Sequence, residues 1–258
     1  MLLTIDCGNT NITLGIFNED KLISRFRITT KQARTSDEYM IVFYNLLRSN
    51  ELEIANITDV VISSVVPSIM HSLNNSIYKL FKVKPLIVGP GNKTGIKINA
   101  DNPKEVGADR IVNVTAAYHQ YHKACLIIDF GTATTFDYVD DEGTFKYTII
   151  TPGIELAANA LSNNAAKLPQ IEITMPKTIL ATNTINGMKA GLIYGYIGQV
   201  EYIITRIKKE LNQDFLVIAT GGLGRIIKDN SEMVNIYNRN LAFYGMKYIY
   251  ENTKKALK

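Results

Sequence analysis

The feature that most constrains the fold is a short polar motif that ends an apolar strand twice. The apolar residues 1–5 lead into Asp6-Cys7-Gly8-Asn9-Thr10, and residues 124–128 lead into Asp129-Phe130-Gly131-Thr132. Glycine lets the backbone turn sharply and approach a ligand, and successive backbone N–H groups form a concave anion site. Because each copy also offers a hydroxyl group, two such turns are suited to gripping one polyphosphate.

The carboxylate in each copy predicts a cation. An aspartate beside a phosphate is repelled unless a cation lies between them, so Asp6 and Asp129 imply magnesium or another metal ion. A single Asp-x-Gly is also a common tight turn. The duplication favours the functional interpretation, because the sequence that follows each copy repeats as well.

Each motif is followed by the same predicted order of elements. After Asp6 we expect strands over residues 12–17 and 21–28, and after Asp129 over residues 134–139 and 144–150. Each of these three-stranded meanders then gives way to helices that alternate with short apolar strands. We predict helices over 37–49 with Ser36 as cap, 67–81, 154–165, 186–211 and 241–253, and strands over 59–63, 85–88 and 215–219.

This alternation predicts an α/β fold built by duplication of a βββαβα unit. We expect a boundary at residues 118–123, which gives a first domain over 1–118 and a second over 119–258. Ligands favour domain interfaces and the carboxyl ends of strands, so the cleft between the halves is the expected site.

The composition limits the possible functions. A chain of 258 residues with 46% hydrophobic residues can form two ordinary domains. The net charge of +4 is scattered, and the lysines from Lys254 onward suit a solvated helix end, so nucleic-acid binding is not expected. No apolar run approaches the roughly 20 residues of a membrane span. We therefore expect a cytoplasmic protein with no membrane partner.

The cysteines and histidines are weak catalytic candidates. Cys7 and Cys125 lie in apolar strand patterns and are predicted to be buried reduced thiols, although a slightly reactive Cys7 stays open. His119 and His122 could share a metal ion, but a surface pair is favoured because no further ligand lies at suitable spacing. No GxxxxGK[ST] loop is present, so any use of ATP would rely on the aspartate turns.

A third polar group, Gly107-Ala108-Asp109-Arg110, precedes an amphipathic run. Asp109 could simply cap a helix, and Arg110 could extend along its surface. Alternatively, an aspartate that faces a cleft could accept the proton of an attacking hydroxyl, and an arginine could hold a carboxylate in two parallel bonds. This second interpretation suits a substrate with a hydroxyl at one end and a carboxylate elsewhere.

Together these motifs resemble those of type III pantothenate kinases, which belong to the superfamily of acetate and sugar kinases, heat-shock ATPases and actin. The resemblance runs in motif order from residue 1 to beyond residue 240. It implies two ribonuclease-H-like (actin-like ATPase) domains. The stretches that carry it are residues 1–17, Asn102-Pro103, Gly107 to Arg110, residues 129–135, Thr151-Pro152-Gly153 and Thr220-Gly221-Gly222.

The resemblance implies transfer of the γ-phosphoryl group of ATP to pantothenate, which gives 4′-phosphopantothenate in the first step of coenzyme A biosynthesis. Asp109 would be the general base, with Gly107, Ala108, Arg110 and Thr184 around pantothenate. Asp129 would help to hold a monovalent cation, K⁺ or NH₄⁺, and Asp6 would contact Mg²⁺ directly or through water. The implied ATP-binding residues are Asp6, Cys7, Gly8, Asn9, Thr10, Asn11, Ile12, Thr13, Thr132, Gly221 and Gly222.

The resemblance also implies a homodimer with substrate sites near the subunit interface. One departure is Ala100, which stands where many members carry an aromatic residue, so the pocket for pantothenate could differ in shape. Two alternatives stay open. The chain could be a kinase of the same superfamily that acts on another small hydroxyl or carboxylate compound, or a nucleotide sensor without catalysis.

Overall fold

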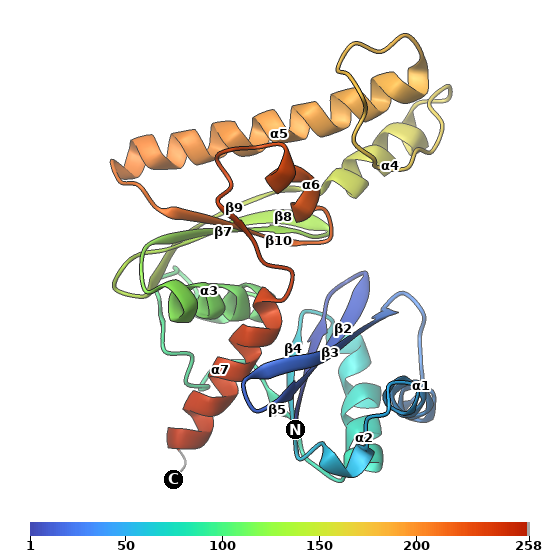
Figure 1. Cartoon of the computed structure of the whole chain (residues 1–258), viewed down its shortest axis with the longest axis vertical. Coiled ribbons are helices and arrows are strands. Elements are labelled where there is room, and N and C mark those ends of the chain that lie inside the picture. The colour runs from blue at the N-terminus through green and yellow to red at the C-terminus, as the bar shows by residue number, and fades with distance from the viewer. Residues whose placement is uncertain (257–258) are drawn as a thin grey trace. The chain divides into compact units, whose positions relative to one another are not determined.

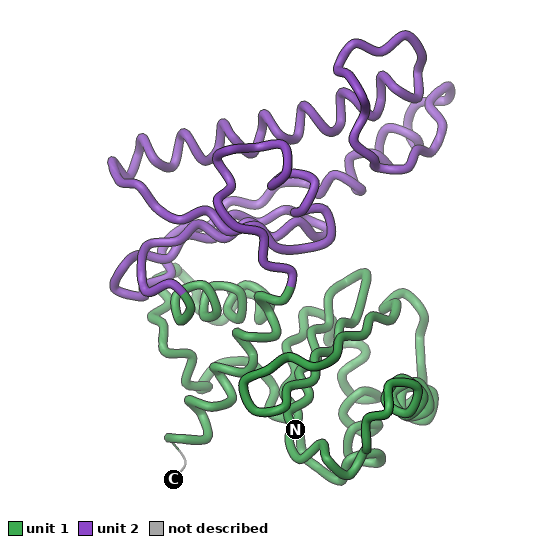
Figure 2. Tube along the Cα trace, viewed as in Figure 1, with its two compact units in different colours: residues 1–120, 240–258 green, residues 121–239 purple. Residues whose placement is uncertain are grey.

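The chain folds into two units (Figure 2). Each unit is built on a β-sheet. The structure is a computed structural model that describes residues 1–256. The first unit contains Met1–Gln120 and the segment from Asn240 onward, and the second contains Tyr121–Arg239. No helix within residues 1–256 is both long enough and apolar enough to span a membrane.

The sheet of the first unit has the strand order β3-β2-β1-β4-β5. The first three strands form an antiparallel meander, and β4 and β5 run parallel to β1. The strands are β1 (Leu2–Cys7), β2 (Asn11–Asn18), β3 (Lys21–Thr29), β4 (Asp59–Ser64) and β5 (Leu86–Ile87). The unit also contains helices α1 (Ser36–Arg48), α2 (Met70–Phe81), α3 (Ala108–Tyr121) and α7 (Leu241–Ala256), the short strand β6 (Lys97–Ile98), and the 3-10 turns η1 (Ile54–Asn56), η2 (Pro67–Ile69) and η3 (Pro103–Glu105).

Helices cover both faces of this sheet, because successive side chains of a strand point to opposite faces. The odd-numbered residues of β1, among them Leu3 and Ile5, pack in one core with residues of α1 and α2. Leu2, on the other face, packs in a second core with residues of α3 and α7. Asp6 shares the face of Leu2, so its carboxylate belongs to the side of the sheet that carries α3 and α7 (Figure 1).

The strands of the second unit repeat this arrangement and lie in the order β11-β10-β7-β8-β9. Its meander is also antiparallel, and β10 runs parallel to β7 just as β4 runs parallel to β1. The matching order and directions confirm the predicted duplication. The elements are β7 (Cys125–Phe130), β8 (Ala133–Val139), β9 (Thr144–Pro152), α4 (Ile154–Asn164), α5 (Thr184–Leu211), β10 (Leu216–Gly221), α6 (Gly224–Asp229) and β11 (Ile236–Tyr237).

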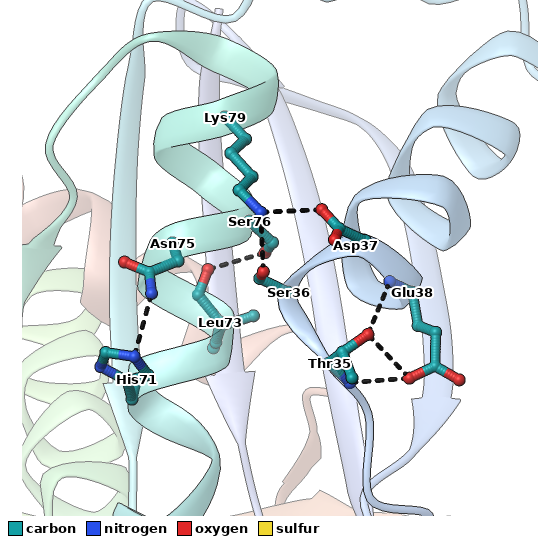
Figure 3. A network of polar contacts seen from close by, with 9 residues as sticks. All are labelled: Thr35, Ser36, Asp37, Glu38, His71, Leu73, Asn75, Ser76 and Lys79. Carbon is teal, nitrogen blue, oxygen red and sulfur yellow. Dashed lines mark hydrogen bonds and ion pairs between the residues drawn. The ribbon is translucent and has the colours of Figure 1, made fainter.

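Helix α1 begins one residue earlier than the sequence suggests. Its N-cap is Thr35 rather than Ser36, and Thr35 forms a capping box with Glu38 (Figure 3). The Thr35 hydroxyl accepts the N–H of Glu38 at 3.3 Å, and the Glu38 carboxylate accepts the N–H of Thr35 at 2.7 Å. Ser36 instead accepts a hydrogen bond from Lys79 of α2, which links the two helices.

The division into domains at residue 118 stays a prediction, as does the cleft between them. The units of the structure differ from that division in the placement of α7. This helix follows the second unit in the sequence but packs against β1 and β4 of the first. Phe243 and Met246 of α7 belong to the same core as Val112 of α3.

Candidate functional site

The first predicted phosphate turn joins β1 to β2 and is closed by backbone hydrogen bonds. The N–H of Gly8 donates to the carbonyl oxygen of Asn11 at 3.0 Å. Thr30, which follows β3, donates its N–H to the carbonyl oxygen of Thr10 at 3.0 Å. Its hydroxyl donates to the carbonyl oxygen of Gly8 at 2.8 Å. The turn is therefore held from both ends, while Asn9 at its tip is exposed.

Not every predicted ATP-binding position offers a side chain to a ligand. Cys7 and Ile12 are 1% and 0% exposed and belong to the core beneath α1 and α2. These two positions can contribute only backbone groups. The exposed or half-buried members are Asp6, Gly8, Asn9, Thr10, Asn11 and Thr13.

The end of β4 and the start of α3 lie beside this turn. Asp6 pairs with Ser63 in the parallel register of β1 and β4, and the N–H of Val65 donates to the carbonyl oxygen of Cys7 at 3.1 Å. A methyl group on Gly107 would lie 3.5 Å from Cγ1 of Val65. The sheet edge that carries Asp6 therefore also carries the start of the Gly107–Arg110 segment.

Asp109 lies in the first turn of α3. The carbonyl oxygen of Gly107 accepts the N–H groups of Arg110 and Ile111, both at 3.1 Å, so Gly107 rather than Asp109 holds the N-cap position. One carboxylate oxygen of Asp109 accepts the N–H of Arg110 at 2.8 Å. A negative charge is favourable at this positive end of a helix. The half-buried carboxylate thus has a fixed orientation.

The second turn follows β7 and is more tightly packed. Asp129 pairs with Thr220 of β10, and both project from the face opposite to α5. Gly221 has φ +83°, and a methyl group on it would lie 2.7 Å from a carboxylate oxygen of Asp129. Only glycine fits here, because both the backbone angle and the space exclude a side chain. Gly221 therefore brings β10 against the Asp129 carboxylate.

The neighbouring residues leave the backbone of this region accessible. A methyl group on Gly222 would have no heavy atom within 4 Å, and Thr132 is exposed. The hydroxyl of Tyr237 donates to the carbonyl oxygen of Gly221 at 3.1 Å and fixes that peptide. Asp129, Thr132, Gly221 and Gly222 are therefore brought together at one edge of the second sheet.

Thr184 is not brought to this edge. It lies in the exposed first turn of α5, after Asn183, whose side chain accepts the N–H of Asn186 at 2.9 Å. The buried residues of α5, among them Ile193 and Val200, pack on the sheet face that carries Leu126 and Ile128. Asp129 projects from the other face, so α5 and Asp129 lie on opposite sides of the sheet.

The cysteines are buried free thiols, as predicted. Burial, with the nearby carboxylate of Asp6, raises the pKa of the Cys7 thiol far above its ordinary value. Burial raises the pKa of Cys125 to about 12. Neither thiol ionises near neutral pH, and this argues against a reactive Cys7.

His119 packs against α7. A surface pair was predicted, and His122 is exposed, but His119 is half-buried and stacks on Tyr248 with ring centroids 5.0 Å apart. One ring nitrogen of His119 lies 3.3 Å from the carbonyl oxygen of Thr94. Within residues 1–256, no group of three or more His, Cys, Asp or Glu side chains could hold a metal ion.

The sequence is similar to one enzyme family over most of its length. The profile of the family described as type III pantothenate kinase matches residues 2–206. A type III pantothenate kinase from Agathobacter rectalis is 50% identical over 260 residues, which cover 100% of both chains. One from Bifidobacterium longum subsp. infantis is 45% identical and covers 99% of this chain and 100% of its own.

Solved structures show the same fold at low identity. A conserved putative Baf family transcriptional activator from Campylobacter jejuni has a TM-score of 0.60 at 17% identity, over 98% of this chain and 99% of its own. A putative 2-dehydro-3-deoxygalactonokinase from Sinorhizobium meliloti has a TM-score of 0.54 at 12% identity, over 100% and 97%. These likenesses support the duplicated fold alone.

Proposed function

The chain belongs to the type III pantothenate kinase family and phosphorylates pantothenate with ATP in coenzyme A biosynthesis, and we propose that Asp109 is the general base of this reaction. The family assignment decides against the two alternatives, a kinase for another small acceptor and a nucleotide sensor. One observation carries the proposal: Gly107, which precedes Asp109, lies at the same sheet edge as the Asp6 turn.

In this proposal the first unit holds the acceptor and part of the phosphate chain. The primary hydroxyl of pantothenate attacks the γ-phosphorus, the bond from that phosphorus to the leaving oxygen of ADP breaks, and Asp109 accepts the hydroxyl proton. Gly107 lets pantothenate approach the backbone, and Arg110 binds its carboxylate. Phosphoryl transfer depends mostly on alignment and on neutralisation of charge. The turns therefore contribute more to the rate than Asp109 does.

We assign the nucleotide to the two aspartate turns, with Gly221 and Gly222 contributing from the second unit. A kinase uses ATP with a divalent metal ion. Mg²⁺ prefers one or two carboxylates together with phosphate oxygens and water, and the half-buried carboxylate of Asp6 fits that preference. Asp129 would hold a monovalent cation, which neutralises phosphate charge when bound. The free thiols suit the cytoplasm as the location.

The test is the variant Asp109→Asn. It keeps the size of the side chain and an oxygen that can accept the N–H of Arg110, so the protein should fold and bind ATP. Turnover should fall about 10²- to 10⁴-fold, the usual contribution of a general base. The measurement is pantothenate-dependent release of ADP, with ATP binding followed separately.

The matched control is Asp214→Asn. Asp214 is 91% exposed and pairs with Lys208 at the surface, so its loss should leave turnover unchanged. Near-normal turnover of Asp109→Asn would remove Asp109 from the role of base. Loss of ATP binding in the same variant would instead point to a structural role for the start of α3.

A further inference from the structure

We propose that Thr30 is a positioning residue that orients the first phosphate turn for ATP, an inference that rests on the proposed role of this turn. Thr30 is 8% exposed and follows directly after β3. Its hydroxyl donates to the carbonyl oxygen of Gly8 at 2.8 Å, and its N–H donates to the carbonyl oxygen of Thr10 at 3.0 Å. The residue that follows the third strand thereby fixes two peptide planes of the turn.

The geometry of the peptide group gives these bonds a consequence for ligand binding. In a planar trans peptide the C=O and the following N–H point in opposite directions. Because the Gly8 carbonyl points toward Thr30, the N–H of Asn9 points away from Thr30. Asn9 is exposed. Donors that already have the required orientation bind an anion without a further cost of ordering.

The second turn shows that the Thr30 hydroxyl is a special feature of the first. In the second unit the N–H of Gly153 donates to the carbonyl oxygen of Thr132 at 3.1 Å, as the N–H of Thr30 does to Thr10. The strand registers of the two units also match at this point. Thr29 pairs with the first residue of β2, and Pro152 pairs with the first residue of β8. Position 153 is therefore the counterpart of position 30.

The two turns differ in length, and the length decides which residue fits. The N–H of Gly8 donates to a carbonyl oxygen three residues further along the chain. The N–H of Gly131 donates to a carbonyl oxygen only two residues further along. In the shorter turn a methyl group on Gly153 would lie 2.4 Å from the carbonyl oxygens of both Gly131 and Thr132. The longer first turn leaves room for a threonine side chain. The hydroxyl of this threonine donates a hydrogen bond to the carbonyl oxygen of Gly8.

The experiment compares Thr30→Val, which keeps the shape and removes the hydroxyl, with Thr30→Ser, which keeps the hydroxyl. We expect Thr30→Val to raise the KM for ATP about 3- to 10-fold, the effect of one lost hydrogen bond, with the KM for pantothenate nearly unchanged. Thr30→Ser should restore the KM for ATP. Thr58→Val is the matched control, because its hydroxyl bonds to Asp59 at the opposite end of the sheet.

Two further variants help to distinguish a failure of the inference about Thr30 from a failure of the proposed ATP site. A methyl group on Gly8 would lie 3.4 Å from its nearest neighbour, so Gly8→Ala fits the fold but hinders the approach of a phosphate. If Gly8→Ala raises the KM for ATP and Thr30→Val does not, the inference about Thr30 is overturned. If neither variant changes it, the turn does not bind ATP and the proposed site fails as well. Should Thr30→Val not fold, Thr30→Ala removes the same hydroxyl with less bulk.

A purely structural role for Thr30 would give a different pattern. Both KM values would then change together with the melting temperature, and Thr30→Ser would not restore the KM for ATP alone. That result would also overturn the proposal.

Discussion

Arg110 follows the proposed base directly and is half-buried in the first turn of α3. A carboxylate held by a guanidinium group forms charge-assisted hydrogen bonds that are stronger than neutral ones. Arg110→Ala should therefore raise the KM for pantothenate about 10-fold or more, with a smaller effect on kcat. Steady-state kinetics with varied pantothenate measure both values.

The control for this prediction is Arg206→Ala, because Arg206 pairs with Glu210 on the exposed side of α5. Its removal should leave both constants unchanged. An unaltered KM in Arg110→Ala would mean that another group holds the pantothenate carboxylate.

The sequence identified the polar motifs, but not the residue whose hydrogen bonds hold the first of them in place. Asp6, Asp129 and Gly107 are visible because each interrupts or follows an apolar pattern. Thr30 was missed, since its importance depends on hydrogen bonds across the meander, between residues that are far apart in the sequence.

Helices α7 and α3 pack at a backbone contact that only glycine permits. A methyl group on Gly245 of α7 would lie 1.9 Å from the carbonyl oxygen of Val112 of α3. In an exposed helix, replacement of glycine by alanine stabilises by up to about 1 kcal/mol. Here the clash with backbone should reverse the sign, and Gly245→Ala should destabilise by about 3 kcal/mol or more. Thermal unfolding measures the change.

Helix α5 supplies the comparison for that variant. Methyl groups on Gly191, Gly195 and Gly198 would have no heavy atom within 4 Å. Alanine at any of these positions should leave the melting temperature unchanged or raise it. A normal melting temperature in Gly245→Ala would show that α3 and α7 can separate at little cost.

The types of the elements were predictable, whereas their ends and their packing were not. The periodicity of apolar residues placed the main strands and helices, including α7. The start of α5 was set two residues too late, because the cap Asn183 precedes a short segment without helical periodicity. The packing of α7 on the first unit rests on contacts far apart in the sequence, which local patterns do not reveal.

We predict that the activity of the protein depends on a monovalent cation. ADP release should be faster in K⁺ or NH₄⁺ than in Na⁺ at equal ionic strength, because the smaller sodium ion holds its water more tightly. Asp129→Asn should remove most of this difference. Equal rates in all three salts would contradict a cation role for Asp129.

We also predict a homodimer that shares its sites between subunits. Thr184 lies in the exposed first turn of α5, where a second subunit can reach it, and we predict that it contributes to the pantothenate site of the other subunit. Exposed apolar side chains support a contact surface near this region; they are Leu156, Leu161, Ile179, Leu180 and Ile185. Light scattering should give twice the mass of one chain.

Subunit mixing tests the shared site. Thr184→Ala and Asp109→Asn should each be impaired alone, and activity should reappear when the two variants are mixed under conditions that exchange subunits. No recovery on mixing would place Thr184 and Asp109 in one subunit. Leu180→Glu should weaken the dimer, and Ile41→Glu, at an exposed position of α1 in the first unit, is the control.

The placement of α7 determines when the protein can finish folding. Phe243, Met246 and Ile249 complete a core whose other members lie in the first part of the chain. During synthesis on the ribosome, the second unit emerges entirely before this helix does. The half of the enzyme that is made first is therefore completed last, and a ribosome that stalls before residue 241 leaves the first sheet with one face partly uncovered.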